Sequence, residues 1–274
     1  MENRQEICAV MRQRANLYRF LSRIYILEAD EKLLAQMKQM SFPEEPGDAD
    51  LRDGYARLKE YLAGVHFSGG EAVEAVAANA SANAESAVHA GTEKSEKIGG
   101  TSEINEASVG NAESGEEEIG GNIAEKITEL EVEYARIFLA AGVAQGTAAF
   151  PYESVYTNKK HLVNQEACDD LTALYAAKGL KPREDMYRIP DDHAGLEFEY
   201  MARLCDTAVR ACEADDEAAL EESVREQKTF FEHHLRRWVS LFGGDIAKHA
   251  QTAFFDGIGR ITRGFMVQET AFLK

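Results

Sequence analysis

Apolar side chains recur at helical spacing along most of the chain, and this periodicity constrains the fold more than any other feature. Residues 196–208 place an apolar side chain on every helical turn, and residues 231–242, ended by Gly243 and Gly244, do the same with aromatic rings. No segment alternates apolar and polar residues with the period of two that a half-buried strand requires. The sequence therefore predicts an all-α fold, with residues 1–274 forming a single domain of about eight or nine helices.

Residues 68–125 differ in composition from everything around them. The segment contains no aromatic residue, no Pro and no Cys, and its twelve Glu against two Lys carry -10 of the net charge of -18. Its few branched apolar residues are scattered, so they cannot bury enough surface to offset the loss of chain entropy. We predict a disordered, low-complexity acidic insertion within the domain. A tolerated surface insertion and a partner-binding element both fit this composition.

The charge balance and the cysteines exclude several classes of protein. With 30 basic and 48 acidic residues, the chain lacks the basic face that binding to nucleic acid or to anionic lipid requires. No apolar run approaches the roughly 18 to 20 residues of a membrane span, and the N-terminus lacks the apolar core of a secretory signal. The four cysteines form no CxxC pair, which favours reduced thiols in the cytoplasm.

Two segments stand out for the density of chemically useful side chains, and the first of them is residues 150–156. It reads Phe-Pro-Tyr-Glu-Ser-Val-Tyr and follows a linker of small residues. Three aromatic rings in a connecting segment are unusual, because loops are normally polar and exposed. Packing onto the core and lining a recognition groove, for which tyrosine is well suited, both remain open.

The second segment is residues 189–193, Ile-Pro-Asp-Asp-His, which leads into the helix that begins near residue 194. Acidic residues in a first turn complement the helix dipole by about 0.3–1 kcal/mol, so Asp191 and Asp192 need no further role. Alternatively, the carboxylates could accept hydrogen bonds from an arginine-rich partner. A divalent metal ion held by Asp192, His193 and Glu197 is a third hypothesis, since the last two share a helix face.

Other motifs give no support to catalysis. The chain contains no GxGxxG, GxxxxGK[ST], GxSxG or HExxH motif. His233 and His234 are neighbours and would point about 100° apart on a helix, which makes a poor chelate. They lie next to two arginines, and we expect them to face solvent.

At these two segments the sequence resembles the TorD/DmsD/NarJ family of redox-enzyme maturation chaperones. Three blocks, the last of them in two parts, carry the resemblance and occur in the family's order. The resemblance implies an all-α cytoplasmic chaperone that is not an enzyme and has no cofactor. Such proteins bind the twin-arginine signal peptide of a molybdenum-containing oxidoreductase subunit and delay its export until the subunit is mature. The blocks are Leu130–Phe138, Pro151–Tyr156, Pro190–His193 and Leu196–Met201.

Carried over residue by residue, the resemblance also implies where the signal peptide binds. Two of the positions would line the apolar part of the groove, and the other five belong to the two dense segments. Ile189 departs from the family, in which many members have an acidic residue before the proline. The implied binding residues are Tyr134, Phe138, Pro151, Tyr152, Ser154, Asp192 and His193.

Two other functions are compatible with the residues. One is a helical metal-dependent hydrolase that uses Asp192, His193 and Glu197, and the other is a general protein-binding adaptor that uses the acidic insertion. We expect neither a nucleic acid partner nor stable membrane insertion. A monomer and a homodimer fit the sequence equally well, and the sequence does not identify the client reductase.

Overall fold

A computed structural model describes residues 2–43, 46–67, 117–180 and 189–274. Most of these residues are helical and none forms a β-strand, so the predicted all-α class is confirmed. None of the described helices is both long enough and apolar enough to cross a membrane. In chain order the elements are α1 (Glu2–Ile26), α2 (Glu31–Gln39), α3 (Ala49–Ala63), α5 (Glu117–Phe138), the 3-10 turn η1 (Val143–Gln145), α6 (Glu153–Thr157), α7 (Glu166–Ala177), α8 (Ala194–Glu213), α9 (Glu217–Phe230), the π-helical η2 (Phe231–Leu235), α10 (Arg236–His249) and α11 (Ala253–Phe272).

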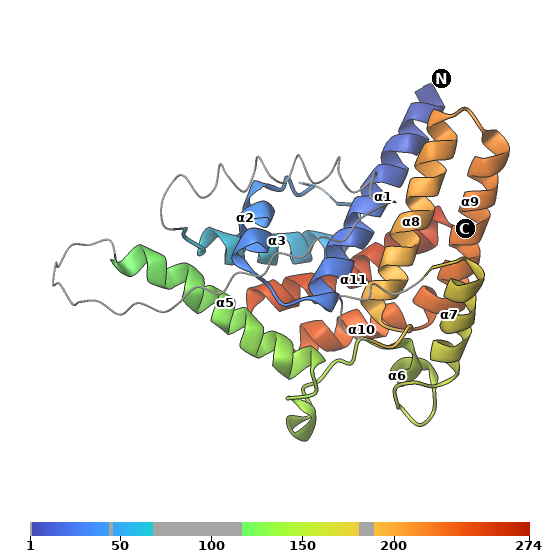
Figure 1. Cartoon of the computed structure of the whole chain (residues 1–274). Coiled ribbons are helices and arrows are strands. Elements are labelled where there is room, and N and C mark those ends of the chain that lie inside the picture. The colour runs from blue at the N-terminus through green and yellow to red at the C-terminus, as the bar shows by residue number, and fades with distance from the viewer. Residues whose placement is uncertain (1, 44–45, 68–116, 181–188) are drawn as a thin grey trace, which may run out of the picture.

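Helices α1 and α8 lie side by side and form the centre of the core (Figure 1). The rings of Tyr18 and Tyr25 on α1 are completely buried, and their centroids lie 5.7 and 5.9 Å from that of Phe198 on α8. Phe242 on α10 adds a ring 4.9 Å from Tyr25. Aromatic pairs at these separations contribute about 0.5–1.5 kcal/mol beyond their buried area. The helical stripes of the sequence therefore meet in one aromatic core.

Helix α11 packs against both α3 and α10 at very short range, and glycines make this possible. A Cβ atom on Gly257 would lie 2.8 Å from the carbonyl oxygen of Gly54, and one on Gly259 would lie 2.6 Å from that of Gly243. Side chains at these positions would push the helices apart. The sequence-based prediction that a helix ends at Gly243 is wrong, because α10 continues to His249. Gly243 lies inside the helix because it faces α11 at close range.

The boundary of the acidic insertion differs from the prediction. Residues 68–116 lie outside the described residues, so the predicted disorder there stays a prediction. Residues 117–125, however, belong to α5. Ile123 is only 6% exposed and extends the apolar stripe of Ile127 and Leu130 by one turn. Two isoleucines among Gly and Glu residues gave too weak a periodic signal to place the start of this helix.

The cysteines also correct the sequence-based expectation. Cys8 on α1 and Cys212 at the end of α8 form a disulfide, with their Cα atoms 6.1 Å apart. The prediction of reduced thiols is therefore wrong for this pair in the structure, whereas Cys168 and Cys205 are free. The pairing joins residues separated by 204 positions. It depends on α1 lying along α8, which sequence spacing does not reveal.

A buried ion pair ties the N-terminal helix to the C-terminal one. The guanidinium group of Arg14 on α1 donates to both carboxylate oxygens of Glu269 on α11, at 2.6 and 2.5 Å. Gln227 on α9 accepts a further bond from Arg14 at 2.6 Å, and the hydroxyl of Tyr18 donates to Glu269 at 2.7 Å. The ionic side chains are 6% and 1% exposed. Because Glu269 and Gln227 are supplied by α11 and α9, this network fixes how α1, α9 and α11 meet.

Candidate functional site

The two chemically dense segments of the sequence lie against each other. The amide of Ala194 donates to the carbonyl oxygen of Pro151 at 2.8 Å, and a second backbone hydrogen bond of 2.9 Å runs in the opposite direction. Both segments directly precede or begin a helix, α6 in one case and α8 in the other. We call residues 151–154 and 190–194 the junction.

Asp192 holds the junction together from the inside. Its side chain is fully buried, and its Oδ2 atom accepts a hydrogen bond from the amide of Ser154 at 2.9 Å. The equally buried Oγ of Ser154 accepts in turn from the amide of Gln165, at 3.1 Å. The other carboxylate oxygen, Oδ1, has no hydrogen-bond partner in the described part of the chain. Asp192 therefore fixes the loop with one oxygen and keeps the other uncommitted.

His193 is the N-cap of α8. Its Nδ1 atom accepts a hydrogen bond from the amide of Gly195 at 3.0 Å, and its ring lies edge-on to that of Tyr152 with centroids 5.1 Å apart. The backbones of Tyr152 and His193 form an isolated antiparallel bridge. Burial lowers the pKa of His193 to about 3, because the charged imidazolium would lose its hydration. The ring is therefore neutral at physiological pH and acts as a hydrogen-bond acceptor.

This pKa predicts a specific loss of stability in acid. The unfolded chain takes up a proton on His193 below its ordinary pKa of about 6.5, whereas the folded chain does so only near pH 3. The contribution of His193 is complete above pH 6.5 and falls by about 1.4 kcal/mol per pH unit below it. His193→Asn keeps a capping side chain and removes this titration. Urea unfolding between pH 7 and 4 should show a shallower decline for the variant.

His161→Asn is the control for His193→Asn. Because His161 is exposed, its replacement should leave the decline of the free energy of unfolding with pH as it is in the wild type. Identical pH profiles for wild type and His193→Asn would contradict a buried neutral imidazole.

A cluster of buried acidic groups lies beside the junction. Glu153 and Glu197 are both 0% exposed. Glu153 accepts from Arg237 at 3.3 Å and lies 2.8 Å from Nδ1 of His234, while Glu197 accepts from the indole N–H of Trp238 at 3.3 Å. His234 belongs to the π-helical turn η2, an irregularity that often occurs at functional sites. The expectation that His234 faces solvent is wrong, since its side chain is only 14% exposed.

The electrostatics of the cluster favour a neutral Glu197. Burial, and after it the nearby charge of Glu153, raise the pKa of Glu197 well above its ordinary value. Its Oε1 atom has no hydrogen-bond partner among the described residues. No sequence signal could reveal the cluster, because Glu153 and Glu197 meet partners from helical segments that lie far along the chain.

The hypothesis of a metal site at Asp192, His193 and Glu197 is not supported by the geometry. Within the described residues, no three His, Cys, Asp or Glu side chains come close enough to hold a metal ion. His193 has committed Nδ1 to capping α8, and Asp192 has committed Oδ2 to Ser154. The i,i+4 spacing that suggested a shared helix face fails because His193 lies before the first turn of α8.

Tyr134 and Phe138 lie in the core of the structure. They are 5% and 3% exposed, and the hydroxyl of Tyr134 donates to the carbonyl oxygen of Tyr25 at 2.8 Å. The ring of Phe138 contacts those of Tyr25, Phe242 and Phe255, with centroids 5.6 to 6.1 Å apart. In this conformation neither side chain lines an open groove, because the stripe they belong to is the one that α5 buries. Peptide contact at these positions would require the core to open.

A few side chains of the junction region do reach the surface. Tyr152, Val155 and Asp191 are partly exposed, whereas Pro151 is buried. Asp191 accepts a hydrogen bond from the hydroxyl of Thr172 on α7 at 2.5 Å. The buried groups therefore position a small surface that includes the aromatic ring of Tyr152 and the carboxylate of Asp191.

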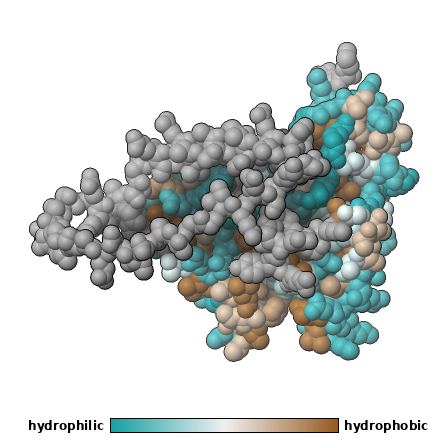
Figure 2. All heavy atoms as spheres, in the orientation of Figure 1, coloured by the Kyte–Doolittle hydropathy of each residue, from teal (hydrophilic) through white to brown (hydrophobic). Residues whose placement is uncertain are grey.

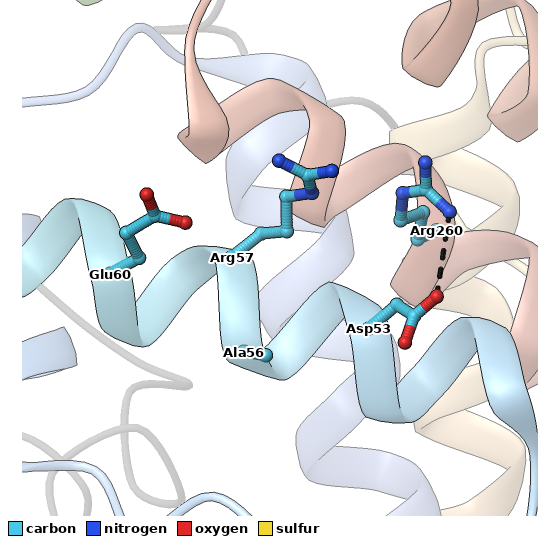
Figure 3. Close-up of a pocket in the computed structure, with 5 residues that line it drawn as sticks. All are labelled: Asp53, Ala56, Arg57, Glu60 and Arg260. Carbon is cyan, nitrogen blue, oxygen red and sulfur yellow. Dashed lines mark ion pairs between the residues drawn. The ribbon is translucent and has the colours of Figure 1, made fainter.

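A separate hollow of about 420 Å³ lies between α3 and α11 (Figure 3). Asp53 and Arg57 on α3 face it together with Arg260 on α11, and the Asp53 and Arg260 side chains lie 3.8 Å apart. Arg57 and Arg260 also pair with Asp256, at 2.6 and 2.8 Å. Because these charges neutralise one another, the hollow offers no unbalanced charge to a ligand.

Comparison with known proteins finds one similar family and several similar proteins. The family model "Nitrate reductase delta subunit" matches residues 111–243, which include the junction and the acidic cluster. "Chaperone protein TorD" of Vibrio cholerae serotype O1 (strain ATCC 39315 / El Tor Inaba N16961) is 26% identical over 141 residues, or 52% of this chain and 60% of the relative. The protein of the same name from Vibrio vulnificus (strain YJ016) is 23% identical over 145 residues, or 53% of this chain and 64% of the relative.

These curated relatives are matched over only about three fifths of their own length. No solved structure gave a significant match. The matched region nevertheless contains every sequence block that carries the resemblance, in the same order. The all-α architecture agrees with these matches, and over residues 111–243 the chain is similar to the family described as "Nitrate reductase delta subunit" and to curated proteins named "Chaperone protein TorD".

Proposed function

We propose that this protein is a cytoplasmic chaperone that binds the twin-arginine signal peptide of a molybdenum-containing oxidoreductase subunit and assists the maturation of that subunit before export. In this role it is not an enzyme, and its partner is a polypeptide. The observation that carries the proposal is that the region matched by the family model, residues 111–243, contains the junction. The curated relatives that the chain matches are named as chaperones.

The chemistry of the junction is compatible with a peptide that carries paired arginines. A guanidinium group forms bidentate hydrogen bonds with carboxylates. Asp191 is a partly exposed carboxylate in the same junction as the aromatic ring of Tyr152, and the buried Asp192 has one uncommitted oxygen. In this proposal Asp192, His193 and Ser154 position the loop, and Pro151 and Tyr152 shape the surface that the peptide meets. Tyr134 and Phe138 would contribute only if binding opens the core.

Calorimetry with synthetic peptides tests this function. The probe is a peptide with an arginine pair followed by an apolar stretch, and it should bind the full chain with measurable heat. Replacing both arginines by lysine should weaken binding moderately, because lysine keeps the charge and loses the bidentate fork. Polar substitution of the apolar stretch should weaken binding more, since exposed ion pairs typically contribute only about 0–1 kcal/mol. We therefore expect weak dependence on salt.

Two variants of the chain separate recognition from folding. His193→Ala and Asp192→Asn should lower the affinity for the peptide while the helix content, measured by circular dichroism, stays near that of wild type. Unfolding of both variants would assign these residues to structure alone. The absence of any binding between the wild-type chain and the peptide would contradict the proposed function.

A further inference from the structure

The outer face of α5 carries a row of exposed side chains opposite the buried stripe of that helix. Glu125, Glu129, Val132 and Leu139 are spaced by four, three and seven residues, which keeps them on one face of a helix. Leu139 follows the last helical residue, but its amide still donates to the carbonyl oxygen of Ala135 at 3.2 Å, so the helical path continues to it. The row runs along a helix at the edge of the molecule (Figure 1).

The C-terminal half of this row is apolar and open to solvent. Val132 is 65% exposed and Leu139 is 58% exposed, and Val143 in the next turn is 52% exposed. Figure 2 shows apolar surface at the lower edge of the molecule, where α5 ends. Single exposed apolar residues are ordinary. Here, however, they continue a hollow on the same face.

That hollow has a volume of about 560 Å³ and lies between α5 and the start of α11. On α5 it is lined by Glu125, Glu129 and Val132, and Gln251 and Thr252 form the opposite side. Its residues therefore come from two separate parts of the chain, and it overlaps the exposed row at three positions.

The floor of the hollow is fixed by Glu133. This carboxylate is 2% exposed and accepts a hydrogen bond from the amide of Thr252 at 3.0 Å and another from Arg136 at 3.1 Å. The bond from Thr252 ties α5 to the N-terminus of α11. It therefore holds the two sides of the hollow at a fixed separation. Because the carboxylate of Glu133 already accepts these hydrogen bonds, the negative charge that the hollow offers to a partner comes from Glu125 and Glu129.

The charges follow a definite order along the helix. Glu125 and Glu129 lie at the N-terminal end of the row. Lys126 pairs with Glu129 at 2.9 Å, and its single positive charge does not neutralise both carboxylates. The apolar residues Val132 and Leu139 follow. This order, acidic and then apolar, complements a peptide in which arginines precede an apolar stretch.

We propose that the outer face of α5, from Glu125 to Leu139, is a docking surface for the signal peptide, with its arginines next to Glu125 and Glu129 and its apolar stretch on Val132 and Leu139. This inference rests on the proposed function, and it assigns the arginine pair to Glu125 and Glu129 rather than to the carboxylates of the junction. Residues 68–116, with nine Glu against two Lys, carry the wrong charge to occupy an acidic surface. A second copy of the same face would be repelled for the same reason.

The apolar half is tested with the full chain and a fluorescent peptide that carries an arginine pair followed by an apolar stretch. The double variant Val132→Ser/Leu139→Ser changes only exposed side chains, so folding should be unaffected. We expect its affinity to fall at least about tenfold, because two apolar contacts lose their burial. Val267→Ser on α11 is the matched control, since Val267 is 54% exposed, and it should bind like wild type.

The acidic half is tested with Glu125→Gln/Glu129→Gln. Its affinity should fall about two- to fivefold at low salt, as expected for exposed ion pairs, and the difference should vanish at about 1 M salt, where the screening length is only about 3 Å. Glu217→Gln/Glu221→Gln is the matched control. It changes the net charge by the same amount on α9, away from the α5 docking surface, and should not change the affinity for the peptide.

The outcomes separate this inference from the proposed function. Peptide binding by the wild-type chain, with both α5 variants equal to their controls, would overturn the docking surface and leave the function intact. A wild-type chain that does not bind the peptide would overturn both. If the variants change self-association in sedimentation experiments while peptide affinity stays constant, the α5 face is an interface between copies and the inference is wrong.

Discussion

Replacing Glu269 by Ala is expected to destabilise the protein by about 3–5 kcal/mol, because it leaves the buried guanidinium group of Arg14 without its counter-charge. In the structure Arg14 is 6% exposed and donates two hydrogen bonds to Glu269. The hydroxyl of Tyr18 also loses its acceptor. Since the pair connects α1 to α11, the loss should affect the cooperative unfolding of the whole domain. Urea denaturation at pH 7 measures the effect.

An exposed ion pair serves as the control for this variant. Glu222 pairs with Arg225 at the surface of α9, where both side chains are more than half exposed, and Glu222→Ala should cost about 0–1 kcal/mol. The double variant Arg14→Met/Glu269→Gln should recover part of the loss, because it removes the unpaired charge and keeps an acceptor for Tyr18. Equal effects of Glu269→Ala and Glu222→Ala would contradict the buried network.

Opening the disulfide is expected to cost about 2–5 kcal/mol, the range found for native disulfides. Cys8 and Cys212 close a loop across a sequence separation of 204 residues, and the chain-entropy model gives about 5 kcal/mol for a loop of that size. Cys8→Ser should therefore unfold at lower urea concentration than the oxidised wild type. Reductant should lower the urea midpoint of the wild type to that of Cys8→Ser, and it should leave the midpoint of the variant unchanged. This comparison matters because the cytoplasm keeps most thiols reduced.

Cys168→Ser is the control for the disulfide, because Cys168 is a free thiol and its removal should leave the response to reductant intact. Thiol titration of the oxidised, unfolded chain should find Cys168 and Cys205 alone. Reactivity of all four cysteines without reductant, together with an unchanged midpoint when reductant is added, would contradict the bond.

Local spacing was sufficient to predict the helical class, and the Pro-Asp-Asp-His segment marked the start of α8. The stripes of residues 196–208 and 231–242 have the period of an amphipathic helix, and that period depends only on neighbouring residues. Gly179 takes a positive φ of 68° directly after the C-cap of α7, as expected for a residue without a Cβ atom. The order of the sequence blocks was likewise enough to indicate the family.

The composition of residues 68–125 predicted an insertion but not where it ends. The last turns of that range belong to α5, because Ile123 is buried against the core. The two dense segments were recognised as candidates from their residues alone. That they form one junction follows from hydrogen bonds such as that between the amide of Ser154 and Asp192, which are 38 residues apart in sequence.

What the tertiary structure alone decided is which partner each side chain meets. Tyr134 and Phe138 share the face of α5 that packs inward, and the sequence could not tell whether an aromatic stripe borders a groove or the core, because both are apolar. Cys8 meets Cys212 and Glu153 meets His234 only because distant helices lie side by side. Periodicity is a local property of the chain, whereas burial, pairing and pKa depend on contacts between segments that are far apart in sequence.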